Sequence, residues 1–231
     1  MKKTIEYANG DKYIGEVNND GKPHGKGILH FTHPTTVRTW KCRYEGDFVD
    51  GKMQGKGVLC EEYAKMEDGV KREGDFVDGK LHGYGKRWFK GHLRYEGEWQ
   101  NGREHGAGTV HSFPLLGYYI KCTWKEGKRH GLSTTYYVSD NSIRYEANYD
   151  MDKAYGRAVY YPREDKYFPD VVKQEGECDA NGDIYKGTLY YTNGDRYEGM
   201  FFASRLEGKG VYIYADGTKE EREYDFGERI T

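Results

Sequence analysis

The chain has 231 residues, of which 36% are apolar and 32% are charged. The formal net charge is only -2, which excludes a disordered tail of one charge sign. An apolar share below the roughly one half of typical globular domains also argues against one thick hydrophobic core. Gly (32) and Tyr (23) are abundant, which predicts many tight turns between strands covered by aromatic rings.

The sequence predicts a cytoplasmic protein. The lysines near the N-terminus are not followed by an apolar run, so no signal peptide is expected. The longest stretch without a polar side chain, residues 113–120, is too short to span a bilayer. Four widely spaced cysteines without a Cys-x-x-Cys pair fit a reduced, intracellular compartment. Association with a membrane, the cytoskeleton or a large assembly stays open.

One sequence phrase recurs along the chain. It reads YEGDFVDGKMQGKG from Tyr44 and YEGEWQNGREHGAG from Tyr95. The distance between the starts of neighbouring copies has a fixed minimum, and every longer distance comes from added residues. This pattern indicates a repeat array. The copies start at the following residues: Tyr13, Tyr44, Arg72, Tyr95, Ile120, Tyr145, Gln174 and Tyr197, with a half copy from Glu220.

Each copy predicts a β-hairpin. Alternation places Tyr95, Gly97 and Trp99 on one face of a strand, and the dipeptide Asn101-Gly102 favours a tight hairpin turn. Glycine weakens a strand, so a glycine within a strand needs a reason, such as space for a large neighbouring group. We therefore expect a large ring from the neighbouring strand to lie across Gly97.

The pattern Y-x-G-x-W-x-N-G-x-x-x-H-G-x-G resembles the MORN repeat (membrane occupation and recognition nexus) over residues 7–227. The resemblance implies an all-β fold, an elongated single antiparallel sheet of stacked hairpins without significant helix, in one domain over residues 1–231. It also implies scaffold or partner-docking roles. Cys122 and Ala147 replace the strand glycine, and the copy from Gln174 departs most from the pattern.

The sequence predicts no enzyme, no bound metal and no cofactor. Histidines recur at one repeat position, but equivalent positions of neighbouring hairpins lie roughly 9–10 Å apart, too far to share a zinc ion. We expect these histidines to bond the turns: His24, His82, His105 and His130. Residues 179–190 lack the Gly and Glu of a calcium-binding EF-hand loop. The Gly-x-Gly pairs lack the third glycine and the helix of a phosphate loop.

The predicted function is a non-enzymatic protein-protein interaction scaffold that docks partners on an aromatic face and on an edge with insertions. In most copies an aromatic ring lies four residues after the start, and these rings should form one row packed on glycine. The candidate partner-binding residues combine this row, the tyrosines that open copies and three apolar residues of one link: Tyr44, Phe48, Phe76, Tyr95, Trp99, Phe113, Leu115, Leu116, Trp124, Tyr145, Tyr149, Tyr197 and Phe201.

The links between copies vary in length, whereas the turns within copies hardly do. All links lie on the same edge of a hairpin array, where insertions are either recognition segments or tolerated excursions. Both interpretations stay open. The long links are residues 30–42, 60–71, 112–120 and 161–173.

The alternative function is a peripheral membrane module that binds acidic phospholipids. Basic residues recur after the turns and should form a ladder along the edge opposite the links. Nearby carboxylates and the net charge of -2 limit this attraction and exclude nucleic acid as an expected partner. The ladder residues are Lys22, Lys52, Lys80, Arg103, Lys128, Lys153 and Arg205.

The two ends of an open sheet carry unpaired backbone groups that invite another strand. Lys2 and Lys3 lie at one end, and Glu220, Glu221 and Glu223 lie at the other, in a half copy expected to lack a second strand. These charges either favour head-to-tail self-association or protect the edges from pairing. Both alternatives stay open.

Overall fold

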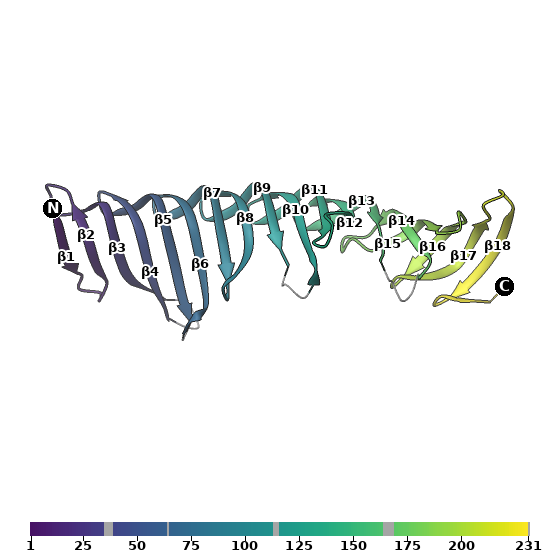
Figure 1. Cartoon of the computed structure of the whole chain (residues 1–231), viewed down its shortest axis with the longest axis horizontal. Helices are drawn as coiled ribbons and strands as arrows, with labels where there is room; N and C mark the ends of the chain where they lie inside the picture. The colour runs from purple at the N-terminus through teal and green to yellow at the C-terminus, as the bar shows by residue number, and fades with distance from the viewer. Residues whose placement is uncertain (35–38, 64, 113–115, 164–168, 231) are drawn as a thin grey trace. The chain divides into compact units, whose positions relative to one another are not determined.

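The structure is a computed structural model that describes residues 1–34, 39–63, 65–112, 116–163 and 169–230. Within these ranges the chain forms strands and turns and contains no α-helix (Figure 1). The all-β prediction is confirmed. No helix long and apolar enough to cross a bilayer occurs in the described ranges.

The chain divides into two compact units, unit 1 (Met1–Leu116) and unit 2 (Gly117–Thr231). Within each unit, every strand pairs antiparallel with the next strand in the sequence. The predicted stacked antiparallel hairpins are therefore confirmed in each unit, while a single domain over residues 1–231 stays a prediction.

The strands of unit 1 are β1 (Lys2–Glu6), β2 (Lys12–Val17), β3 (Pro23–Pro34), β4 (Thr39–Val49), β5 (Lys52–Tyr63), β6 (Lys65–Val77), β7 (Lys80–Phe89), β8 (His92–Gln100) and β9 (Arg103–His111). The strands of unit 2 are β10 (Tyr118–Lys125), β11 (Lys128–Tyr137), β12 (Ile143–Asp150), β13 (Lys153–Tyr160), β14 (Val171–Cys178), β15 (Ile184–Tyr191), β16 (Arg196–Phe202), β17 (Arg205–Ile213), β18 (Lys219–Asp225) and β19 (Glu228–Arg229).

The turns inside copies have the predicted two-residue form. Asp50 and Gly51 have φ angles of 47° and 90°, and Asn101 and Gly102 have φ angles of 52° and 79°. Two successive positive φ angles match the right-handed twist of the flanking strands, and Asp, Asn and Gly tolerate them. The hairpin prediction from these dipeptides is confirmed.

The turns of unit 1 are also bonded to the preceding copy. The N–H of Gly51 donates to the carbonyl of Pro23 at 2.8 Å, and the N–H of Gly102 donates to the carbonyl of Leu81 at 2.8 Å. These bonds tie each of these turns to the hairpin before it. The turn edge therefore keeps a constant construction, whereas the opposite edge accommodates links of different length.

The first two long links continue the strands. In the first link, residues 30–34 of β3 pair with residues 39–43 of β4, and Phe31 faces Cys42. In the second link, residues 60–63 of β5 pair with residues 65–71 of β6. The described parts of both insertions therefore lengthen hairpins. Two parts of the remaining long links lie outside the described residues: 113–115 and 164–168.

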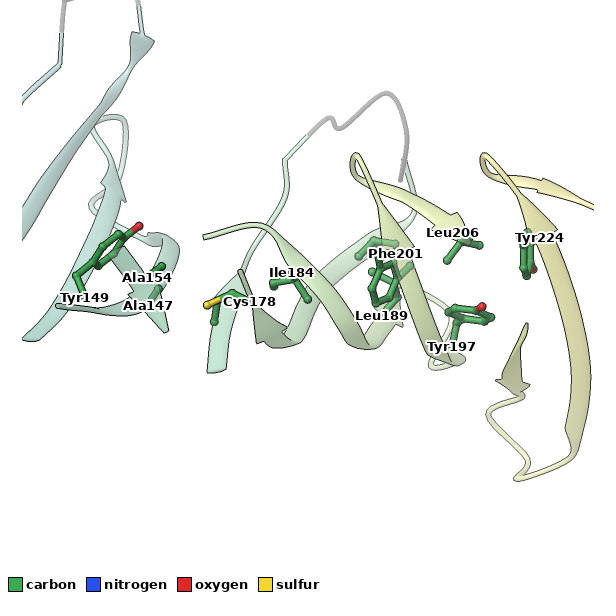
Figure 2. Close-up of a cluster of buried hydrophobic side chains, with 12 residues drawn as sticks. Ala147, Tyr149, Ala154, Cys178, Ile184, Leu189, Tyr197, Phe201, Leu206 and Tyr224 are labelled. Atoms are coloured by element: carbon green, nitrogen blue, oxygen red, sulfur yellow. The ribbon is translucent and has the colours of Figure 1, made fainter. Parts of the chain in front are cut away.

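A row of small residues crosses the strands of each unit, because the hairpin register places them opposite one another. In unit 1 the row consists of Gly15, Gly27, Gly46, Gly57, Gly74, Gly85, Gly97 and Gly108. In unit 2 it consists of Cys122, Ser133, Ala147, Ala158, Gly176, Gly187 and Gly199. The buried rings lie on one face of this row. The cluster in unit 2 is shown in Figure 2.

The half copy at residue 220 has a second strand. β18 pairs with the two-residue strand β19, in which Glu228 faces Asp225 and Arg229 faces Tyr224. The expectation that this half copy lacks a second strand is wrong, because Phe226 and Gly227 form a tight turn with positive φ angles that brings the chain back.

Candidate functional site

In unit 1, the tyrosine that opens a copy lies across the glycine pair of its own hairpin. A Cβ atom added to Gly57 would lie 2.2 Å from the Tyr44 hydroxyl oxygen, and one added to Gly46 would lie 2.6 Å from it. The Tyr44 ring is fully buried, which raises the pKa of its hydroxyl, and the hydroxyl donates to the Asp47 carbonyl at 3.2 Å. Glycine is required here because a side chain would occupy the space of the ring.

The same arrangement corrects one sequence expectation. The ring over Gly97 and Gly108 belongs to Tyr95, which lies in the same strand as Gly97. The expected ring from a neighbouring strand therefore does not cover Gly97. The rings four residues after a copy start pack edge-on against tyrosines instead: Phe48 lies 5.0 Å from the Tyr13 ring centroid at an interplanar angle of 76°.

Most of the predicted partner-binding rings are buried. Eight of them are less than 5% exposed: Tyr44, Phe48, Phe76, Tyr95, Trp99, Tyr149, Tyr197 and Phe201. Trp124 and Tyr145 are half-buried, Leu116 is 55% exposed, and Phe113 and Leu115 lie outside the described residues. The eight buried rings pack the protein and present almost no surface, so their docking role stays a prediction.

The carboxylate three residues after a copy start has a structural partner. The pairing between β8 and β9 has an irregularity, a β-bulge, where Gly106 has a φ angle of 57°. The next residue, Ala107, donates its N–H to the Glu98 carboxylate at 3.4 Å. In the hairpin of β4 and β5, the N–H of Lys56 donates to the Asp47 carboxylate at 3.1 Å. These carboxylates accept hydrogen bonds from the backbone of the second strand of their hairpin and so stabilise its β-bulge.

Two of the four repeated histidines contact a turn. His130 Nδ1 lies 3.1 Å from Asp150 Oδ1, and His24 Nδ1 lies 3.5 Å from Asp50 Oδ1, each aspartate belonging to the following copy. The turn-bonding prediction is confirmed for these two. In the described part of the chain, no group of three or more His, Cys, Asp or Glu residues could hold a metal ion.

The predicted basic ladder lies next to the turns, and its members are exposed except for the half-buried Arg205. Carboxylates of the turns share this edge, since Lys52 Nζ lies 2.6 Å from Asp78 Oδ1. Such exposed pairs contribute little to stability, but they lower the positive potential of the edge. Lipid contact by the ladder stays a prediction.

The face of unit 1 opposite the tyrosine rings carries a groove of about 950 Å³. Its floor is the glycine row from Gly15 to Gly85, because these residues have no side chain to fill it. One wall is a row of cross-strand neighbours: Ile14, Ile28, Glu45, Val58, Glu73 and Lys86. The other wall contains Lys26, Lys56 and Tyr84.

The two walls of the groove differ in composition. Three of the six residues of the first wall are apolar, namely Ile14, which is 43% exposed, and the half-buried Ile28 and Val58; the other three are charged. On the other wall, Lys26 Nζ lies 2.6 Å from Asp47 Oδ1, and an equivalent pair joins Lys56 to Asp75 at 2.7 Å. An apolar surface bordered by charged groups is typical of protein interaction sites.

Sequence reasoning missed this groove, although a local signal for it exists. Ile14 and Ile28 each lie next to a strand glycine and alternate with the residues of the tyrosine face. An apolar residue on the second face of a single sheet has no core to cover it. That pattern indicates a surface available to a partner.

A family model for the MORN repeat matches residues 13–32, 44–60, 73–94, 95–112, 123–141 and 197–219, which is more than half of the chain. The chain therefore belongs to the MORN repeat family, whose units are interaction modules and not a known class of enzyme. The matches coincide with six of the predicted copies. The copies from Tyr145 and Gln174 are not matched, yet they form the hairpins β12–β13 and β14–β15.

Alsin is similar to this chain over most of the chain's length. The identity to alsin from Mus musculus is 28% over 181 residues, which covers 76% of this chain and 10% of alsin. The identity to alsin from Homo sapiens is 29% over 168 residues, which covers 71% of this chain and 10% of alsin. The match thus covers about a tenth of the length of these curated relatives.

Proposed function

We propose that this protein is a non-enzymatic protein-interaction scaffold and that the groove of unit 1 is its docking surface. The observation that carries the proposal is the groove of about 950 Å³ over the glycine row. Most of the predicted rings are buried on the opposite face, so the groove side chains are available for binding without a loss of core packing.

The construction of the groove suggests how a partner lies in it. The groove crosses β1 to β7, so a partner lies across the strands and does not pair along one of them. The backbone N–H and C=O groups of the floor are engaged in the strand pairing, which leaves recognition to side chains. Apolar partner residues pack against Ile28 and Val58, and polar ones meet the ion pairs of Lys26 and Lys56.

Two matched substitutions test the proposal. Val58→Arg places a long charged side chain in the groove, whereas Val49→Arg adds the same charge at an exposed position, 45% accessible, beside a turn of the same hairpin. Proteins captured from a cell extract by each variant are quantified by mass spectrometry. We expect Val58→Arg to reduce the amount of captured partner about tenfold and Val49→Arg to leave it unchanged.

Equal capture by both variants contradicts the groove as the docking surface, provided that both unfold at the wild-type denaturant concentration. Co-sedimentation with acidic phospholipid vesicles separates the scaffold from the membrane alternative. The scaffold function requires no vesicle binding. Strong binding that weakens with salt and is lost when Lys22, Lys80 and Lys128 are replaced by Glu supports the membrane alternative.

A further inference from the structure

The repeat that starts at Gln174 lacks both rings that fill the regular copies. Gln174 stands where most copies have tyrosine, and Cys178 stands where most have Phe, Trp or Tyr. In Figure 2, Cys178 and Ile184 lie between Tyr149 on one side and Phe201 on the other. Next to this hairpin, within unit 2, is a cavity of about 480 Å³, the size of a side-chain or small-ligand site.

Aromatic rings supplied by three hairpins line this cavity. The rings are Tyr145, Tyr160, Tyr185, Phe201 and Phe202. A cation placed over the face of such a ring within about 6 Å is attracted by the ring's electron density. One such contact already exists at the wall, where the Arg144 guanidinium carbon lies 5.5 Å from the centroid of the Tyr160 ring. The lining is therefore suited to cationic groups.

The charged groups of the lining are Arg144, Asp179 and Asp183, one cation and two carboxylates, so their net charge is -1. Asp179 Oδ1 accepts the backbone N–H groups of Asn181, Gly182 and Asp183, which engages it in the turn. Asp183 is exposed, and its carboxylate forms no hydrogen bond or ion pair with any described residue. Asp183 is thus available to an incoming cation.

Gln174 is the second polar group of the cavity. It is 7% exposed and lines the cavity. The amide oxygen of Gln174 can accept a hydrogen bond from a bound group.

The turn that borders the cavity is strained. Ala203 and Ser204 have φ angles of 46° and 58°, although neither is Gly, Asn or Asp. Such conformations cost free energy and concentrate at functional sites. The preceding residue, Phe202, is 59% exposed and presents its ring to the cavity lining and to solvent.

We propose that this cavity binds the basic side chain, Lys or Arg, of a partner protein. The cationic head lies against the aromatic walls and donates hydrogen bonds to the Gln174 amide oxygen and the Asp183 carboxylate. The aliphatic stem packs on Phe201 and Phe202. The site lies in unit 2, does not depend on the groove of unit 1, and is lined by the Gln174 that replaces the usual tyrosine.

Titration of the full, 15N-labelled chain with Nα-acetyl-lysine methylamide tests the proposal. We expect chemical-shift changes at the Gln174 side-chain amide and at residues 182–184, with millimolar affinity. The neutral norleucine analogue and the glutamate analogue should cause neither. Asp183→Asn should weaken binding about tenfold, because it removes the unpaired carboxylate. Asp225→Asn, an exposed carboxylate of β18, should leave binding unchanged.

Gln174→Tyr is the decisive variant. Gly176 and Gly187 face each other beside position 174, and the atoms nearest to a Cβ added at either are backbone atoms, so a tyrosine has the glycine pair it needs. This variant should unfold no earlier than the wild type and should lose lysine binding. Unchanged binding by Gln174→Tyr, no shift at Gln174 in the wild type, or equal binding of the glutamate analogue would overturn the proposal.

Discussion

Unit 1 and unit 2 build the same hairpin, and the copy from Tyr197 in unit 2 also places its ring over a glycine pair, but the copy from Tyr145 is filled in a different way. In unit 1, Tyr44 lies over two glycines that leave room for its ring. In unit 2, Ala147 and Ala158 occupy the equivalent row and are almost fully buried, at 1% and 0% exposure. Tyr145 then reaches in another direction, and its hydroxyl donates to the Gly182 carbonyl at 2.6 Å. Within one hairpin, the position of the tyrosine ring therefore depends on whether the row beneath it contains glycine.

The copy from Arg72 shows how unit 1 compensates for a missing tyrosine. A Cβ atom added to Gly85 would lie 2.9 Å from Leu81 Cδ2 and 3.1 Å from Trp99 Cδ1. The space above the glycine pair is filled by one residue of the same hairpin and one of the next. Unit 1 keeps its glycines covered by apolar groups even where the repeat pattern fails.

Unit 2 relies more on cations stacked on rings. The Arg129 guanidinium carbon lies 3.9 Å from the Tyr149 ring centroid, and that of Arg222 lies 3.6 Å from the Tyr212 ring centroid. In unit 1, Tyr44 and Phe76 instead meet edge-on at 5.0 Å. The hairpin frame therefore tolerates polar side chains in place of rings, and the cavity of unit 2 lies beside such a copy.

Trp99→Ala should cause the largest loss of stability in the regular unit. Trp99 is 4% exposed, packs edge-on against Tyr95 at 5.2 Å and covers Gly85. Truncation of such a buried ring should lower the free energy of unfolding by about 3–5 kcal/mol. Urea denaturation followed by circular dichroism measures this. An unchanged transition would show that the ring does not pack the sheet.

Gly57→Ala and Ala158→Gly test the coupling between ring and glycine directly. The new Cβ at residue 57 would clash with Tyr44, and such overpacking should cost about 1–3 kcal/mol of unfolding free energy. Ala158→Gly, at the equivalent position of unit 2, has no ring to accommodate and should cost only about 0.5–1 kcal/mol. Equal losses in urea titrations would refute the difference between the units.

Arg129→Gln tests the cationic filling of unit 2. The Arg129 side chain lies over Tyr149, and its Nε donates to Asp152 Oδ1 at 3.1 Å. The side chain is 30% exposed, so removal of its charge should cost only about 0.5–1 kcal/mol. Thermal unfolding in low and high salt measures it. An equal loss of stability at both salt concentrations would show that the aliphatic stem of Arg129, and not its charge, stabilises the fold.

Glu175→Gln removes a stabilisation that is present above pH 4.5 and absent near pH 2, so its destabilising effect should shrink as the pH falls. Burial raises the pKa of Glu175, but bonds from Tyr190, Lys173 and Arg157 outweigh it and lower the pKa from 4.5 to about 2. A lowered folded-state pKa stabilises the fold above the unfolded value, and this contribution is lost as the pH falls from 4.5 toward 2. The wild type should thus lose stability more steeply than Glu175→Gln over this window.

Tyr190→Phe provides the intermediate case, because it removes only the hydroxyl that donates to Glu175 at 2.7 Å. Its loss of stability with falling pH should begin near the same pH as in the wild type, which the unfolded-state pKa sets, but it should be smaller and complete at a higher pH. Denaturant titrations at several pH values between 4.5 and 2 compare the three proteins. Identical pH profiles would contradict the assigned role of these bonds.

The turns could be predicted because their conformation depends on adjacent residues. Asn101-Gly102 alone favours two positive φ angles, and the alternation of Tyr95 and Trp99 places both rings on one face. The ring that covers a glycine could not be predicted, because it depends on side-chain torsions and on residues of other strands. The alternation also could not reveal that residues 30–34 and 39–43 extend two paired strands.

The candidate surfaces were harder to predict than the fold. A search for functional groups in the sequence selects conspicuous rings such as Phe48 and Phe76, which the structure buries at 1% exposure. The groove is defined by absent side chains at glycines, and the cavity is lined by Gln174, which stands where most copies have tyrosine. Absent groups carry no chemical motif, so they become apparent only when the neighbouring strands are in place.

The glycine row has a consequence for how this surface can evolve. Each regular copy adds one glycine pair to the floor of the groove, and two strands extend a sheet by roughly 9–10 Å. Duplication of a copy therefore lengthens the groove by a fixed step without altering its cross-section. Under the proposed docking function, the number of copies sets the length of the segment that the groove can hold, in whole steps.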